Sequence, residues 1–317
     1  MVSRRRFLSA TGCAAVTAAL SSYASLSRAA AETEVPNAMA SWRPSATAQG
    51  AAMLRAIHQV VDDPLVLADP LALKIIGPEA EASILANPAS HDTRRALRAF
   101  VVLRSRYAED ELARAVDEGV GQYVLLGAGL DTFGYRNAHR RLKVFEVDHP
   151  ATQRWKRERL SAAQIAVPES VTYAPVDFER ETLAQGLTRA GFDPSRPAFF
   201  SMLGVAVYLT KPALRDTLAY VASLAQGTGI VFSYGVSNDL LTESQKRSRT
   251  QSALRVADLG EPWLSYYEPA ALAWDLMDIG FGKVTDVDGA TANLRYFRGR
   301  ADGLRVSSTS RLMAARV

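Results

Sequence analysis

The stretch that decides the fold is Leu125-Leu126-Gly127-Ala128-Gly129-Leu130-Asp131. It closes an apolar run of strand length and then breaks into two glycines, a pattern typical of the turn at the carboxyl end of a parallel strand. Glycine has no Cβ and lets the backbone pass close to a ligand. A glycine pair by itself is more often only a tight strand-to-helix turn, so this interpretation needs a second signal.

An acidic pair at the end of the next apolar run supplies that signal. Glu146 and Asp148 follow Gly127 by 19 and 21 positions, and an acid about 20 residues beyond such a loop is placed to hold the hydroxyl pair of a ribose. A dinucleotide fingerprint would need a third glycine at position 132, where this chain has Thr132. The two signals together predict a mononucleoside ligand, and a nicotinamide-dependent oxidoreductase is the weaker alternative.

Apolar runs and helical stretches alternate from residue 122 onward. This alternation predicts an α/β domain over 119–317, with a mostly parallel sheet and helices on both faces. The expected strands are 123–126, 144–147, 171–176, 198–203, 230–234, 283–287 and 311–317, and the expected helices are 150–165, 182–190, 211–225 and 269–279.

The sequence upstream of the sheet divides into three parts. Residues 49–118 carry apolar side chains at helical spacing, with one long helix from Asp92 to about Glu118, and they predict an N-terminal helical cap. Residues 32–48 are rich in Pro, Ser, Ala and Thr, which indicates a linker or arm. Residues 1–31 are predicted to be a twin-arginine signal peptide.

The signal peptide is indicated by Ser3-Arg4-Arg5-Arg6-Phe7-Leu8, and Ala29-Ala30-Ala31 offers small residues for cleavage. The stretch between them is short and rich in Ala, Ser and Thr, so no stable membrane span is expected. A protein exported in this way would meet the twin-arginine machinery transiently and end in the periplasm or outside the cell. A translation start near Met39 would leave it in the cytoplasm instead.

Composition excludes several classes of function. The chain has 317 residues and a formal charge of +4, from 37 basic and 33 acidic residues. Four of the arginines precede the first acidic residue, Glu32, so the rest of the chain is balanced at 33 against 33, and no nucleic-acid partner is expected. The sole cysteine is Cys13 and the histidines lack metal-ligand spacing, so neither thiolate chemistry nor a metal site is predicted.

In combination, these motifs resemble those of the leucine carboxyl methyltransferase-like enzymes, over a similarity that runs from about Ser45 to Val317. The set is quite specific. It consists of the glycine loop through Thr132 with Tyr135-Arg136, Phe145-Glu146-Val147-Asp148 with Pro150-Ala151-Thr152, Pro175-Val176-Asp177-Phe178, Gly204, Tyr208-Leu209-Thr210, Gly260-Glu261-Pro262-Trp263 and the closing Gly303-Leu304-Arg305.

The resemblance implies a Rossmann-like class I methyltransferase with a seven-stranded sheet, S-adenosyl-L-methionine as cofactor and a small-molecule substrate. It also implies a cofactor site in which each part of the ligand has its own partners. These are Gly127 and Gly129 at the methionine portion, Asp148 or Glu146 at the ribose, Asp177 and Phe178 at the adenine, and Arg104 or Arg106 at the cofactor carboxylate. Ala128 and Asp131 of the same loop are also expected to bind the cofactor.

Methyl transfer from a sulfonium is a direct displacement and requires no nucleophilic side chain. A carboxylate acceptor would need no base, whereas a hydroxyl acceptor would benefit from one within hydrogen-bond reach. Tyr208 and His149 are the nearest candidates for that base, although packing or capping is the more common role for residues so placed. The acceptor pocket is expected near Tyr208, Tyr234, Trp263 and Tyr266.

Two positions depart from the family pattern. Ala46 lies in the arm where relatives carry a cation, and Leu203 replaces the acid that precedes the glycine after the fourth strand. Together with the export signal, these departures keep a second hypothesis open. In that hypothesis the protein is a catalytically retired, exported binder of S-adenosylmethionine or another nucleoside.

Overall fold

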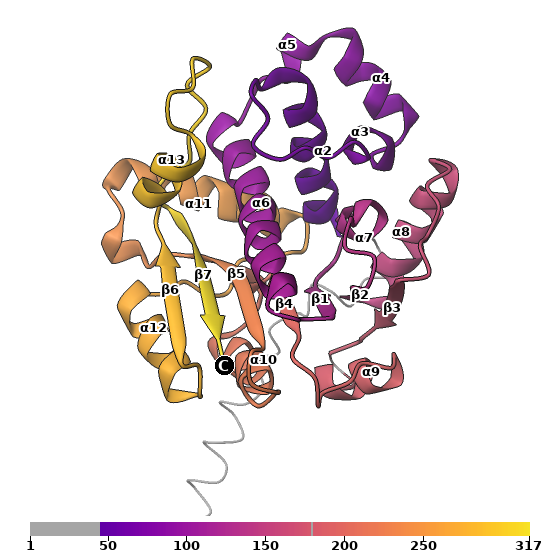
Figure 1. Ribbon diagram of the computed structural model, residues 1–317. Helices are drawn as coiled ribbons and strands as arrows, with labels where there is room; N and C mark the ends of the chain where they lie inside the picture. The colour runs from indigo at the N-terminus through magenta and orange to yellow at the C-terminus, as the bar shows by residue number, and fades with distance from the viewer. Residues whose placement is uncertain (1–44, 179) are drawn as a thin grey trace, which may run out of the picture. The chain divides into compact units, whose positions relative to one another are not determined.

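The apolar runs of the sequence pair into one sheet of seven strands (Figure 1). In the computed structural model, which describes residues 45–178 and 180–317, the strand order is β3-β2-β1-β4-β5-β7-β6. Strand β7 runs antiparallel to both of its neighbours, β5 and β6, and the other pairings are parallel. The strands are β1 (Gln122–Leu126), β2 (Lys143–Asp148), β3 (Val171–Pro175), β4 (Phe199–Met202), β5 (Gly229–Gly235), β6 (Lys283–Val287) and β7 (Ser310–Arg316).

The strand order places β1 in the interior of the sheet, between β2 and β4. It pairs in parallel with β2 on one side and with β4 on the other, so the chain changes direction across the sheet at this point. Open α/β sheets bind ligands at the carboxyl ends of the strands where such a reversal occurs. The predicted fold, a mostly parallel seven-stranded α/β sheet of the class I methyltransferase type, is confirmed.

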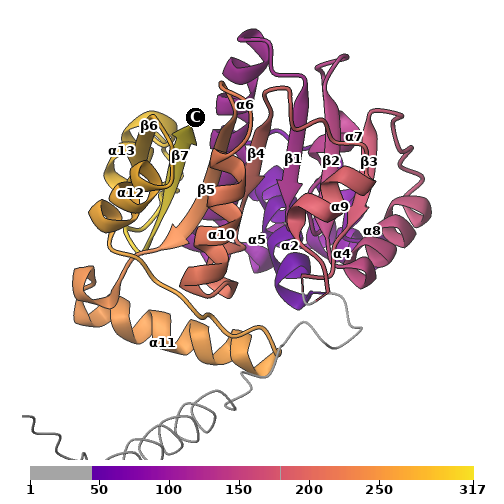
Figure 2. The same ribbon diagram turned by 90° about the horizontal axis from the view of Figure 1, so that it is seen from below.

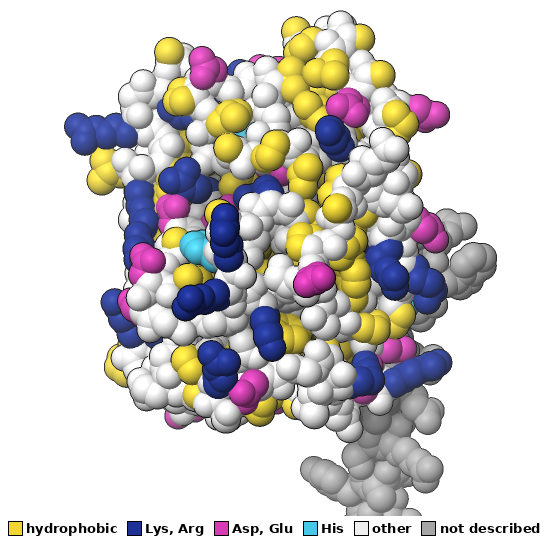
Figure 3. Space-filling view, turned by 45° about the vertical axis from the view of Figure 1, so that its right-hand side comes forward, with side chains coloured by type: hydrophobic (Ala, Val, Ile, Leu, Met, Phe, Trp, Pro, Cys, Tyr) yellow, Lys and Arg dark blue, Asp and Glu magenta, His cyan; other side chains and the backbone are white. Residues whose placement is uncertain are grey.

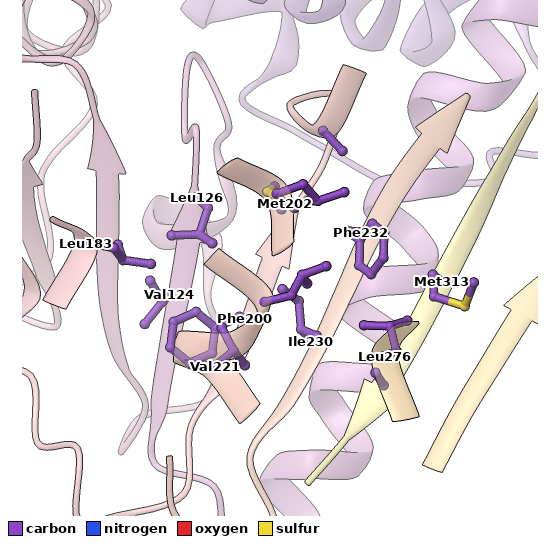
Figure 4. Packing of buried hydrophobic residues seen from close by; sticks show 14 of the residues in the cluster. Val124, Leu126, Leu183, Phe200, Met202, Val221, Ile230, Phe232, Leu276 and Met313 are labelled. Atoms are coloured by element: carbon purple, nitrogen blue, oxygen red, sulfur yellow. The ribbon is translucent and has the colours of Figure 1, made fainter. Parts of the chain in front are cut away.

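Each strand of the sheet centre alternates between two buried faces, because successive side chains point to opposite sides. Val124 and Leu126 join the first core cluster, with Phe200 and Phe232 beside them (Figure 4). Tyr123 belongs to the second cluster on the other face. Helices α9 (Leu183–Arg189), α10 (Lys211–Ala222) and α12 (Pro269–Asp278) cover the first face, and α6 (Arg95–Asp117), α7 (Phe133–Arg136) and α13 (Gly289–Tyr296) the second.

A group of short helices stands beside the long α6 (Figure 1). It shares a third apolar cluster with Leu130 after the glycine loop and with Leu160. These elements match the expected helical cap, whose boundary as a separate domain stays a prediction. They are α2 (Ala46–Val61), α3 (Ala72–Ile75), α4 (Pro78–Ala86) and α5 (Pro88–His91), and Leu160 lies on α8 (Pro150–Ala162).

Two boundaries near the N-terminus differ from expectation. Helix α2 begins at Ala46, so the last three residues of the expected linker are helical, because the Ser45 side chain caps the helix by accepting from Ala48 N at 3.0 Å. Helix α6 begins at Arg95 instead of Asp92, since Arg94 adopts a left-handed conformation with φ 51°. The expected signal peptide, and residues 32–44 of the expected linker, lie outside the described residues.

The segment between β5 and α12 was not anticipated as helical. It contains the short η2 (Asn238–Leu240) and the helix α11 (Glu243–Asp258), which buries only Arg249 and stands apart from the sheet (Figure 2). None of the helices in 45–178 and 180–317 is long and apolar enough to cross a membrane. On the face shown in Figure 3, Lys and Arg side chains are interspersed with acidic and apolar ones.

Candidate cofactor site at the carboxyl edge of the sheet

The glycine loop turns sharply as β1 ends. Gly127 and Gly129 have φ of +70° and +43°, and the amides of Gly127 and Ala128 both donate to Val147 O, at 2.9 and 3.1 Å. The Ala128 methyl is buried in the second core cluster, so this residue offers only its backbone to a ligand. A Cβ on Gly127 would lie 2.4 Å from Cγ2 of Val205, in the segment after β4. The loop therefore needs glycine for both conformation and space.

Replacing Gly127 by alanine is expected to lower the free energy of unfolding by about 2–4 kcal/mol, because a positive φ and the clash with Val205 act together. Gly119→Ala is the matched control. Its φ is +98° and nothing lies within 4 Å of the added Cβ, so only the conformational cost applies. Urea denaturation of both variants measures the difference, and equal losses of stability would show that the close approach to Val205 is not a constraint.

Asp148 ends β2 beside this loop. One carboxylate oxygen accepts from Gly129 N at 2.6 Å and the other from His149 N at 2.7 Å. Burial raises the pKa of Asp148, although the two backbone donors and Lys156 oppose that rise. The side chain is half-buried, not enclosed. Asp148 therefore lies beside Gly129 at the carboxyl edge of the sheet, and its role at the ribose stays a prediction.

Glu146 does not share that position, and the alternative that placed it at the ribose is wrong for this structure. Its side chain is 0% exposed. Oε2 lies 2.8 Å from Lys156 Nζ and accepts from Tyr135 Oη at 3.0 Å, which in turn lies 2.9 Å from the Tyr173 hydroxyl. Two residues before the strand end, the side chain points beneath α7 and α8 and is closed off from the edge. Burial raises the pKa of Glu146, with Lys156 opposing it.

The two candidate arginines of α6 lie on different faces of that helix. Arg106 donates to Asp110 at 2.8 Å and to Val66 O at 3.2 Å, and it borders a surface hollow of about 280 Å³ that none of the loop glycines line. Arg104 instead lies across Gly204, where a Cβ would be 2.3 Å from its Nη1. The geometry therefore places Arg104, and not Arg106, at the carboxyl edge of the sheet.

Arg104 forms no hydrogen bond or ion pair with any of residues 45–178 and 180–317, and the carboxylate whose charge acts on it is Asp131 of the glycine loop. Burial, reinforced by the nearby Arg55, lowers the pKa of its guanidinium to about 10, although Tyr208 and Asp131 oppose that shift. The group is still a cation at neutral pH. A half-buried guanidinium without a hydrogen-bonded carboxylate is costly to maintain in a protein. Such a group fits a site whose carboxylate belongs to the ligand.

Asp131 and the residues around it tie the glycine loop to the cap. Arg55 Nη2 donates to Leu130 O at 2.6 Å, and Thr132 Oγ1 donates to Asp69 at 2.6 Å. Asp131 accepts from Phe133 N at 2.8 Å. Burial alone would raise the pKa of Asp131, but Arg55 and other cations outweigh it and lower the pKa. Asp131 therefore stays negatively charged beside the crevice.

Asp177 and Phe178 follow β3, on the far side of β2 from the glycine loop. The Phe178 ring is 60% exposed, and Asp177 forms an ion pair with Arg180 at 3.4 Å. An exposed aromatic ring can stack on a heterocycle, and a carboxylate beside it can accept a hydrogen bond from the amino group of that heterocycle. Both residues lie at the same sheet edge as Asp148, and their role at the adenine stays a prediction.

The two catalytic candidates differ in their surroundings. His149 caps α8, with Nδ1 accepting from Ala151 N at 3.2 Å, which is the capping role that the sequence favoured. Tyr208 ends the short η1 (Ala206–Tyr208) after β4 and lies near Arg104. No group of three or more metal-ligating side chains occurs in the part of the chain that the structure describes.

The expected aromatic lining of the acceptor pocket is only partly present. The prediction that Tyr234 lines the pocket is wrong, because the residue is 2% exposed and its hydroxyl donates to Asp286 on β6 at 2.6 Å. Tyr266 packs against Gly235 and under Arg249. Trp263 lies close to η1, since the next residue, Leu264, donates its amide to Val207 O at 2.7 Å. Trp263 and Tyr208 therefore remain the aromatic candidates.

The two positions that depart from the family pattern, Leu203 and Ala46, both carry uncharged side chains. Leu203 packs against the second core cluster. Ala46 presents its backbone amide to Glu261 at 2.7 Å. Glu261 was quoted in a motif but not predicted as a site residue, and only the fold brings it to the cap.

Comparison with known proteins establishes the family of the chain. The family model of leucine carboxyl methyltransferase matches residues 48–222. The chain belongs to the leucine carboxyl methyltransferase family. It is therefore an S-adenosylmethionine-dependent methyltransferase, and the nicotinamide-dependent oxidoreductase alternative is set aside.

Relatives of this leucine carboxyl methyltransferase family member cover most of the chain. YktD of Bacillus subtilis, named as an S-adenosyl-L-methionine-dependent methyltransferase, is 29% identical over 291 residues, which are 84% of this chain and 95% of YktD. FRAAL3718 of Frankia alni carries the same description and is 34% identical over 187 residues, 57% of this chain and 64% of its own.

Two solved structures share the fold. A protein from Thermobifida fusca described as a methyltransferase has 18% identity and a TM-score of 0.54, and the match covers 90% of this chain and 98% of that one. A DUF574 family protein from Streptomyces avermitilis has 17% identity and a TM-score of 0.51, over 84% and 96% of the two chains. At these identities the likeness shows the architecture alone.

Proposed function

We propose that this methyltransferase methylates an oxygen atom of a small molecule, and that a carboxylate is its preferred acceptor. The observation that carries the acceptor class is that the candidate bases at this edge are already engaged. The cofactor's place rests on the Arg104 guanidinium, which lies at the same sheet edge as Asp148 and the glycine loop. These groups suit a zwitterionic nucleoside. Arg104 would hold its carboxylate, Asp148 its ribose hydroxyls, and Phe178 its base.

Bound S-adenosylmethionine supplies an electrophilic methyl group on a sulfonium. The chain then has to align the acceptor oxygen with that methyl, exclude water and keep the cofactor tail in place. The negative Asp131 stabilises positive charge near the loop. No covalent bond to the protein is needed.

A carboxylate acceptor is favoured because the candidate bases at this edge are already engaged. His149 accepts from a helix amide, Glu261 is bound to α2, and Asp148 and Asp131 accept from backbone amides. A carboxylate attacks without losing a proton, whereas a hydroxyl would have to pass its proton to a base. Tyr208 is the remaining candidate if the acceptor is a hydroxyl.

Transfer of a radiolabelled methyl group into a mixture of small metabolites tests the proposal. We expect labelled products whose label is released as methanol by mild alkali, because methyl esters hydrolyse and methyl ethers do not. Alkali-stable label would make a hydroxyl the acceptor and direct attention to Tyr208. Absence of incorporation, with cofactor bound, would contradict methyl transfer to small molecules.

Asp148→Asn is expected to weaken binding of S-adenosylhomocysteine by roughly tenfold, because a carboxylate accepts from ribose hydroxyls more strongly than an amide does. The pH dependence gives a second check. Since burial raises the pKa of Asp148, affinity in the wild type should fall on acidification at a higher pH than an ordinary aspartate would allow. The variant should lack that fall. Calorimetric titration across pH measures both, and an identical acid limb in the two proteins would rule out Asp148 as its source.

A further inference from the structure

The first turn of α2 lies directly on the glycine loop. The Cβ of Ala48 is 3.1 Å from the position that a Cβ on Gly129 would take. Ala48 is only partly exposed, so this contact is a packed one. The backbone expected to face the methionine portion of the cofactor is therefore covered by a helix that begins only two residues earlier, at Ala46.

Glu261 holds that turn in place. Its carboxylate accepts from Ala46 N at 2.7 Å, from Ser45 Oγ at 3.1 Å and from Thr47 Oγ1. The residue is 8% exposed, and a carboxylate at a helix N-terminus is favoured by the unpaired amides and the helix dipole. Glu261 is 215 positions from Ala46 in the chain, so these hydrogen bonds are a tertiary contact and not a local helix cap.

The segment that carries Glu261 is also hydrogen-bonded to the loop after β4. Leu264 N donates to Val207 O at 2.7 Å, and Ser265 Oγ donates to Ala206 O at 3.0 Å. The neighbouring Val205 is the residue that closes on Gly127. Contacts therefore run from Gly127 through the β4 loop and Glu261 to α2, and return to the glycine loop at Gly129.

We propose that Glu261 is a positioning residue that closes this ring of contacts around the cofactor's amino acid end, so that cofactor and product exchange only when Glu261 and the first turn of α2 separate. The inference rests on the proposed cofactor site. It assigns a role to a carboxylate that neither touches the reacting atoms nor is needed to form the sheet. Glu261 acts through Ala48, which covers Gly129.

The test is the rate at which S-adenosylhomocysteine leaves the full-length protein, measured by stopped-flow displacement. Glu261→Ala should release it at least tenfold faster, because three hydrogen bonds to a carboxylate are lost. Glu268→Ala is the matched control, since Glu268 also caps a helix, accepting from Ala271 N at 2.6 Å, but lies outside the ring. Its release rate should match the wild type.

A second variant, Thr47→Ala, protects the test against a folding defect in Glu261→Ala. It removes one of the three partners, keeps the Ser45 cap of α2 and leaves the carboxylate bound to Ala46 N, so it should speed release by a smaller factor. Added to Glu261→Ala, it should have no further effect, because the carboxylate that Thr47 binds is already gone.

Additive effects, or an unchanged release rate in folded Glu261→Ala, would overturn the inference while leaving the proposed function intact. Failure of the wild type to bind S-adenosylhomocysteine would overturn both.

Discussion

Replacing Arg104 by alanine is expected to weaken S-adenosylhomocysteine binding roughly a hundredfold, because a charge-assisted pair with the ligand carboxylate is lost. The guanidinium forms no hydrogen bond or ion pair with the described residues, and burial lowers its pKa, so its removal should not destabilise the free protein. The thermal midpoint of the ligand-free variant should equal or exceed that of the wild type. Calorimetric titration and thermal unfolding measure the two effects separately.

The ligand itself offers a control for this variant. 5′-Methylthioadenosine lacks the amino acid tail, so its affinity should be the same in the wild type and in Arg104→Ala. Arg106→Ala is the matched protein control, because Arg106 lies two residues away and is paired with Asp110. Equal losses for both ligands would mean that Arg104 shapes the site generally and does not hold a carboxylate.

The largest effect on stability is expected from Glu146→Gln, at about 3–5 kcal/mol in the free energy of unfolding. The substitution leaves Lys156, which is 1% exposed at the side chain, as a buried cation without its partner. Chemical denaturation measures the loss. Its size distinguishes an internal ion pair from the ribose contact once expected of Glu146, which would alter cofactor affinity and leave folding intact.

A compensating pair sharpens that prediction. Glu146→Leu combined with Lys156→Met removes both charges and should recover most of the lost stability, since apolar side chains of similar volume can replace a buried ion pair at little cost. Stability of the double variant no better than that of Glu146→Gln would show that the hydrogen bond from Tyr135, and not the pairing with Lys156, is the important contact.

The strands of the sheet could be predicted because each is marked by a pattern of neighbouring residues. Apolar runs such as 144–147 and 230–234 are too short for helices and are separated by amphipathic stretches, so their type and order follow from period and length. The same holds for the turn at Gly127, where only glycine fits the backbone. Helix α11 escaped prediction because it buries little besides Arg249 and therefore lacks an apolar face.

The site was predictable only in part, because several of its properties depend on tertiary partners. Position along the strand could not show that Glu146 and Asp148 have different surroundings. Glu146 is buried in an ion pair with Lys156, whereas Asp148 stays half-buried at the strand end. Spacing could not choose between Arg104 and Arg106, since Asp110 occupies only the latter. Glu261 could not be linked to α2 by any local pattern.

The central claim is that a nucleoside cofactor lies across the carboxyl edge of the sheet, between Arg104 and Asp148. A crystal structure of the protein with S-adenosylhomocysteine tests it most directly. We predict the ligand carboxylate at about 3 Å from the Arg104 guanidinium, with the ribose hydroxyls at Asp148. A ligand bound elsewhere, such as in the hollow beside Arg106 and Arg136, with Arg104 left unpaired, would contradict the account.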